Sequence, residues 1–209
     1  MAGTSSWEAL MNVRGTLAPC AGVLLLTAVL AGCGASGSTT VAGPKQPPPA
    51  PGESNPPGDI PDNQAYVAFA PPGAGFTVSV PEGWARTTAG PVTAFTDKLN
   101  RIEVSEHPAT HPPTPASVTA RDVPSLAKSV PAFVPGKATE ASRKAGTAVL
   151  YTYQGNSAAD PVTGKTVRDT FERYVFHHQG RDVVVTLSGP VKADNVDPWR
   201  TVTDSLRWR

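Results

Sequence analysis

Eight prolines between positions 44 and 61 set the strongest limit on what this chain of 209 residues can fold into. Proline lacks the backbone N–H that a helix or a central strand needs, so regular structure cannot run through this segment. The same stretch contains almost no apolar residue that would build a core. We therefore expect residues 33–63 to form a disordered Pro-rich linker that mixes polyproline II with flexible coil. Residues 64–209 then form a single folded domain.

The segment before this linker has the features of an export signal. Arg14 precedes an uncharged apolar run that ends in small residues, in the order Leu30, Ala31, Gly32, Cys33. This order is typical of a bacterial lipoprotein signal peptide, in which signal peptidase recognises the three residues before the cysteine. Residues 1–32 would be removed and Cys33 would carry a diacylglycerol, so that membrane lipid is the expected partner of the anchor. The expected location is the extracytoplasmic face of the cell membrane.

A membrane-spanning anchor is the alternative interpretation of the apolar run, because about 20 apolar residues suffice to span a bilayer. The run ends on small residues and a cysteine, without the Lys/Arg cluster that usually follows an uncleaved anchor.

The start of translation has two candidates. Glu8 is unusual at the charged end of a signal peptide, and a shorter peptide could begin at Met11.

Charge and cysteine content exclude several classes of function. The chain has 18 basic and 17 acidic residues and a formal net charge of +1, with no basic run, so nucleic-acid binding is not expected. Cys20 lies in the signal peptide and Cys33 is the lipid acceptor. No cysteine therefore remains for a disulfide, a thiolate metal site or a cysteine nucleophile.

The remaining sequence predicts several strands and two helices. Alternating apolar and polar residues from Phe76 to Val80 predict a half-buried strand. Further strands are predicted in hairpins, and helices between and after them. The strands are 92–96, 101–106, 137–145, 147–154, 166–178 and 182–188, and the first helix is 116–130. This order favours an α+β domain, an antiparallel β-sheet covered by helices.

Both helices carry local signals. Pro124 is expected to kink or restart the first helix. In the last helix, Asp197 is a good N-cap and is followed by proline. Trp199, Val202 and Leu206 then form one apolar stripe that suits packing on a sheet.

Two stretches carry a resemblance to a known group of proteins. They are the strand and turn Gly75-Phe76-Thr77-Val78-Ser79-Val80-Pro81-Glu82-Gly83-Trp84 and the ending Asp194-Asn195-Val196-Asp197-Pro198-Trp199. With the lipoprotein signal and the Pro-rich linker, they resemble actinobacterial lipoproteins of the LpqN/LpqT type. The resemblance covers about residues 66–209. It implies a fold similar to the PsbP and Mog1 proteins and a location at the cell surface, and it supplies no catalytic residues.

The histidines and motifs give no sign of a catalytic, metal or cofactor site. His177 and His178 are adjacent on a predicted strand, so they point to opposite faces and we expect them at the exposed end of a hairpin. His107 and His111 lie among prolines and are interpreted as loop residues. No Gly-x-Ser-x-Gly elbow or dinucleotide loop is present. The acidic residues near Asp197 are better explained by helix capping than by calcium binding.

Two groups on the predicted strands leave alternatives open. Asp169, Glu172 and Arg173 form either a solvated strand face or ion pairs across a hairpin. Tyr151 and Tyr153 share one strand face, where they either line a groove or cover the core under a helix.

Two hypotheses for function follow. The first is a lipid-anchored binding or accessory domain with a protein partner in the cell envelope, because no catalytic constellation is present. The second is a small hydrolase or small-ligand-binding domain whose site is built from dispersed residues. A cleft that brings together two or more of Asp169, Glu172, Arg173, His177 and Tyr151 would favour the second.

Overall fold

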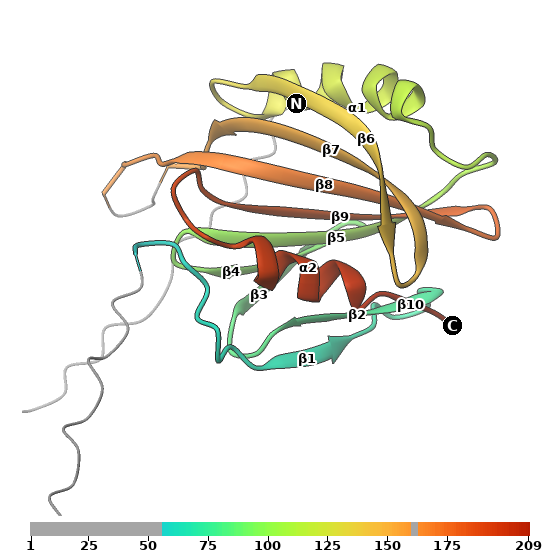
Figure 1. The fold of residues 1–209 in the computed structure, drawn as a ribbon, viewed down its shortest axis with the longest axis horizontal. Coiled ribbons are helices and arrows are strands. Elements are labelled where there is room, and N and C mark those ends of the chain that lie inside the picture. Colours follow the sequence, from blue (N-terminus) through green and yellow to red (C-terminus); the bar gives the residue numbers. More distant parts are fainter. Residues whose placement is uncertain (1–55, 160–162) are drawn as a thin grey trace, which may run out of the picture. The chain divides into compact units, whose positions relative to one another are not determined.

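The computed structural model describes residues 56–159 and 163–209. The expected signal peptide, the expected lipid acceptor Cys33 and most of the expected linker lie outside the described residues. Two antiparallel sheets and two helices, α1 (Pro115–Ser129) and α2 (Val196–Asp204), make up the domain (Figure 1). The larger sheet has the spatial order β3 (Ala85–Ala89), β4 (Val92–Asp97), β5 (Asn100–Pro108), β9 (Arg181–Pro190), β8 (Arg168–His178), β7 (Gly146–Asn156) and β6 (Val134–Arg143). The smaller sheet has the order β1 (Tyr66–Phe69), β2 (Phe76–Pro81) and β10 (Arg207–Trp208).

Side chains alternate across the seven-stranded sheet and build an apolar core on each face. On one face, α2 and the smaller sheet pack on the larger sheet. The core there includes Phe76, Val78, Ile102, Tyr174, Phe176, Val185, Leu187, Trp199, Val202 and Leu206. On the other face, α1 packs on β6 and β7, with Val118, Val149, Tyr151, Tyr153, Val175 and Val184 in the core. The antiparallel sheet with covering helices is therefore as expected, whereas the second sheet was not foreseen.

Helix α1 runs without a break from Pro115 to Ser129, although a kink at Pro124 was expected. Its start is fixed by a capping box in which the Thr114 hydroxyl accepts from the backbone N–H of Ser117, and the Ser117 hydroxyl accepts from that of Thr114. Pro124 is exposed. Water can therefore satisfy the carbonyl group that proline leaves unpaired, and the helix continues past it.

Helix α2 begins two residues earlier than the sequence indicated. Its N-cap is Asn195, not Asp197, and the Asn195 side chain makes no capping hydrogen bond. Trp199, Val202 and Leu206 are all buried, as predicted, but α2 ends at Asp204, so Leu206 lies beyond the helix.

The last part of the expected linker belongs to the fold. Ile60 is buried in the core, and its N–H donates to Asn195 Oδ1 at 2.8 Å. The side-chain amides of Asn100 and Asn195 donate to the carbonyl of Gly58 at 2.9 and 3.0 Å. Both asparagines pack against Gly189, where a Cβ would lie 2.5 Å from Asn100 Oδ1. The expected domain start at residue 64 is thus too late, because apolar content alone did not reveal that two distant asparagines bind the backbone of Gly58 and Ile60.

Three short strands were missed. Every residue of β3 is exposed, so it shows no alternation, and β10 has only two residues. Strand β1 is an edge strand that pairs with β2. Among the helices of the described part of the chain, none is both long and apolar enough to cross a membrane.

Candidate functional site

A cleft of about 1010 Å³ opens on the α1 face of the large sheet. Helix α1 packs on β6 and β7, at one side of this face. The cleft lies between the C-terminal end of α1, the segment that follows β7, and residues of β5, β8 and β9. Its wall includes Leu126, Ser129, Val130, Pro131, Asn156 and Ser157, and its floor includes Arg101, Glu103, Tyr153, Asp169, Phe171, Arg173, Thr186 and Ser188.

The floor of the cleft is polar because of the register of three strands. Thr186 on the central strand β9 lies between Glu103 and Arg173 of the neighbouring strands. Ser188 lies between Arg101 and Phe171 in the next row. Central strands are usually apolar on both faces when both faces are covered. Thr186 and Ser188 are buried, and both line the cleft.

Asp169 is the most unusual residue of the floor. It is only 3% exposed, and its Oδ1 atom is buried without a hydrogen-bond partner among the described residues. Its cross-strand neighbours are Gly155 and Pro190, neither of which has a side-chain donor. Burial raises the pKa of Asp169 to about 6. The carboxylate is therefore desolvated without compensation, which is costly for a structural residue.

The other buried carboxylates on this face are paired. Asp122 of α1 accepts from Arg121 at 2.7 Å and from Arg173 at 2.9 Å. Burial alone would raise the pKa of Asp122, but the two guanidinium groups hold it below its ordinary value. Asp182 accepts from Arg121 at 3.2 Å and lies 2.8 Å from His177 Nδ1. This network attaches α1 to the sheet and makes the isolation of Asp169 distinctive.

Aromatic rings border the polar floor. Tyr153 and Phe171 stack with centroids 4.6 Å apart and planes 7° from parallel. Tyr151 stacks on the other side of Tyr153 at 5.5 Å. Burial raises the pKa of Tyr153 and of Tyr151, so both phenols stay protonated. Of the two alternatives, Tyr151 fits the one in which the ring covers the core under α1. Tyr153 fits both, because it lies in the same core and also lines the cleft.

The structure brings together two of the five residues named from the sequence. Asp169 and Arg173 both line the cleft. Glu172 lies on the opposite face, where it accepts from the Tyr174 hydroxyl at 2.8 Å. The expectation of a solvated strand face is wrong for Asp169, because the neighbouring strands bury it.

The histidines occupy different surroundings from those expected. His177 is held by Asp182 and has a side chain only 16% exposed, so the expectation of an exposed residue is wrong for it. His178 is exposed and stacks on Trp208 on the opposite face. His107 lies within β5, where its Nε2 is 2.9 Å from the Ser105 hydroxyl, so only His111 is a loop residue. Among the described residues, no group of three potential ligands is placed to hold a metal ion.

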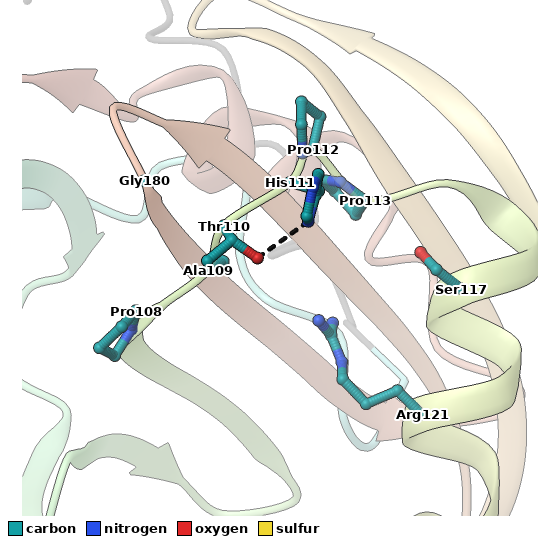
Figure 2. Close-up of a pocket in the computed structure, with 9 residues that line it drawn as sticks. All are labelled: Pro108, Ala109, Thr110, His111, Pro112, Pro113, Ser117, Arg121 and Gly180. Carbon is teal, nitrogen blue, oxygen red and sulfur yellow. Dashed lines mark hydrogen bonds between the residues drawn. The ribbon is translucent and has the colours of Figure 1, made fainter.

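A second pocket of about 490 Å³ lies beside the first turns of α1 (Figure 2). Its loop contributes Thr110 and His111, whose side chains contact each other at 2.8 Å. Ser117 and Arg121 face it from α1, but the first is used in the capping box and the second in the ion pairs with Asp122 and Asp182. These polar groups already have partners, so the larger cleft is the stronger candidate site.

Sequence reasoning missed Thr186 and Ser188. A signal was present, because Asp182, Thr186 and Ser188 share one face of β9 in an otherwise apolar strand. The importance of Asp169 had no such signal, since it depends on what lies opposite in β7 and β9.

Comparison with known proteins yields similar folds only. No family model and no curated protein matches the chain. Solved structures with a similar arrangement include cyanobacterial PsbP from Synechocystis, at 15% identity, and yeast Mog1p, a Ran-binding protein, at 11%. Their TM-scores are 0.47 and 0.48, and the matches cover 77% and 69% of this chain and 98% and 96% of theirs.

LpqN of Mycobacterium tuberculosis, described as involved in cell envelope biogenesis, is also similar. It is 16% identical with a TM-score of 0.39, over 69% of this chain and 91% of that one. The chain spans 48% of the length of a similar structure from Bacteroides thetaiotaomicron, at 14% identity and a TM-score of 0.45. Likenesses of this degree carry no argument about function, which must come from the site.

Proposed function

We propose that this chain is a lipid-anchored protein of the cell envelope whose domain binds a small ligand in the cleft beneath the C-terminal end of α1. The observation that carries the binding role is Asp169, a buried carboxylate without a partner among the described residues, on the floor of an open cleft. Such a group is costly to fold and is typical of a site completed by a ligand. The anchor rests on the sequence around Cys33 alone.

A binding role is favoured over hydrolysis by the state of the polar groups in the cleft. Arg173 is held by Asp122 and Thr186, and Arg101 by Glu103. No described side chain that could act as a nucleophile is hydrogen-bonded to Asp169, so the geometry that activates a hydroxyl is absent from the described cleft. These observations support a role in binding a ligand over a role in cleaving one.

Native mass spectrometry of the protein purified from its own membranes in mild detergent tests this role. We expect a small molecule that stays bound in the native spectrum and is lost on denaturation. The substitution Ser129→Trp should abolish its retention, because Ser129 is exposed and lines the wall of the cleft. Lys128→Trp is the matched control, since Lys128 is the exposed neighbour on the same helix and does not line the cleft.

Two results would contradict the proposal. One is retention of the small molecule to the same extent in Ser129→Trp as in the wild type. The other is a stoichiometric protein that copurifies in place of any small molecule, which would favour the partner-binding alternative. The anchor is tested separately, because Cys33→Ala removes the only proposed thioether acceptor. We expect this variant to incorporate no radiolabelled palmitate, and any incorporation would refute the lipid attachment.

A further inference from the structure

Asp169 has no positive partner because the strands beside it cannot supply one. Gly155 lies opposite in β7, and a Cβ there would meet Val130 Cγ1 at 2.1 Å, so no side chain fits at this position. Pro190 lies opposite in β9 and has no donor at all. The fold thus keeps the surroundings of this carboxylate free of side-chain donors on both sides.

The arginines nearby are committed elsewhere. Arg173, four residues further along β8 on the same face, donates to Asp122 and to the Thr186 hydroxyl. Arg168, the preceding residue, donates to the carbonyl of Ala132 at 2.7 Å. Arg101 pairs with its strand neighbour at 2.7 Å. None of these guanidinium groups donates a hydrogen bond to the buried carboxylate.

Two lysines among the described residues also face the cleft. Lys98 and Lys165 both line it, and neither ammonium group lies within ion-pair distance of Asp169. Since no described side chain compensates the buried carboxylate, a ligand that carries a cation would do so.

We propose that the cleft selects ligands that carry a primary ammonium group, which pairs with Asp169. This selectivity rests on the proposed ligand-binding function. An ammonium group both donates a charge-assisted hydrogen bond and compensates the buried negative charge, whereas a neutral hydroxyl group supplies only the hydrogen bond. The carbon body of the ligand then lies against Leu126, Val130 and Phe171 on the walls and floor. The face of Phe171 adds a favourable surface for the cation.

This selection has a pH dependence with a defined sign. Only the ionised carboxylate pairs with ammonium, and burial raises the pKa of Asp169 to about 6 in the unliganded protein. Affinity should be nearly constant above about pH 7 and weaken by about tenfold between pH 7.5 and pH 5, as the carboxylate becomes protonated. Glu103, the other acidic group there, is paired with Arg101.

Isothermal titration calorimetry of the mature, lipid-anchored protein with n-butylamine and with n-butanol tests the proposal. The two probes match in size and differ in charge. We expect the wild type at pH 7.5 to bind butylamine at least tenfold more tightly than butanol. Asp169→Asn, a neutral isostere, should lose this preference and its pH dependence. Glu140→Gln removes the same charge from an exposed position of β6 and should retain both.

The outcomes separate the two proposals. Equal affinity for both probes, or a preference that survives in Asp169→Asn, would overturn the ammonium selection. If that equal binding is lost in Ser129→Trp, the cleft is still the ligand site and only the ligand class is wrong. If butylamine binds the wild type and Ser129→Trp equally, both the cleft and its selectivity are refuted. A thermal unfolding curve for each variant confirms that it is folded before titration.

Discussion

Removal of residues 56–63 should destabilise the domain, although these residues belong to the Pro-rich part of the sequence. The side chain of Ile60 is 4% exposed and lies in the core with Phe76 and Trp199. Truncation of a buried isoleucine to alanine costs about 2–5 kcal/mol, which includes the cavity left behind. We therefore expect Ile60→Ala to lower the free energy of unfolding by about 2–5 kcal/mol. For a domain of this size, the corresponding fall in Tm is roughly 4–20 °C.

A fragment that begins at Gln64 should lose more than this single substitution does. It lacks the carbonyl of Gly58 and the N–H of Ile60, so Asn100 and Asn195 lose the three hydrogen bonds to this segment and keep only the bond between their own side chains. Both asparagines are at most 5% exposed in the intact domain. Buried polar groups without partners cost about 1–3 kcal/mol each unless water reaches them.

Thermal and urea unfolding of fragments that begin at Gly34, Pro56 and Gln64 measures the effect. We expect the first two to unfold at the same midpoint, because the segment before Pro56 has little apolar surface to bury. Asp62→Ala, an exposed change in the same segment, is the control and should leave the midpoint unchanged. If the fragment that begins at Gln64 unfolds at the same midpoint as the longer ones, the structural role of Ile60 is refuted.

Two further perturbations follow from the core and from the cleft. Trp199→Ala should lower the free energy of unfolding in urea by about 3–5 kcal/mol, because the Trp199 side chain is buried in the core. His178→Ala should lower it by less than about 1 kcal/mol, because the substitution removes only an exposed stacking contact. Equal midpoints for these two variants would show that Trp199 is not a core residue. Asp169→Asn should stabilise the unliganded domain at pH 7.5, because the pKa raised to about 6 means that folding penalises the ionised form. This gain, at most about 3 kcal/mol, should vanish as the pH falls from 6 to below 4; a gain that does not depend on pH would contradict the assigned cause.

The sequence predicted the long strands, both helices and the antiparallel arrangement, because each of these depends on local periodicity. It failed where a structural role depends on residues distant in the chain. Strand β10 forms only by pairing with β2, across more than a hundred residues, and Asn195 serves Ile60 instead of capping its own helix. The candidate site also depends on residues that are distant in the chain. Asp169 resembles any other charged strand residue until Gly155 and Pro190 are known to lie beside it.

The contacts around Gly58 and Ile60 also define where the domain would bear mechanical load. Any tension on the chain that precedes Pro56 reaches the fold first through the bonds to Asn100 and Asn195 and through the buried side chain of Ile60. These two asparagines lie at the start of β5 and at the start of α2, so the load divides between the central sheet and the helix that covers it. Forced unfolding depends on the barrier to opening and not on equilibrium stability. This small junction would therefore set the force at which a tethered copy begins to unfold.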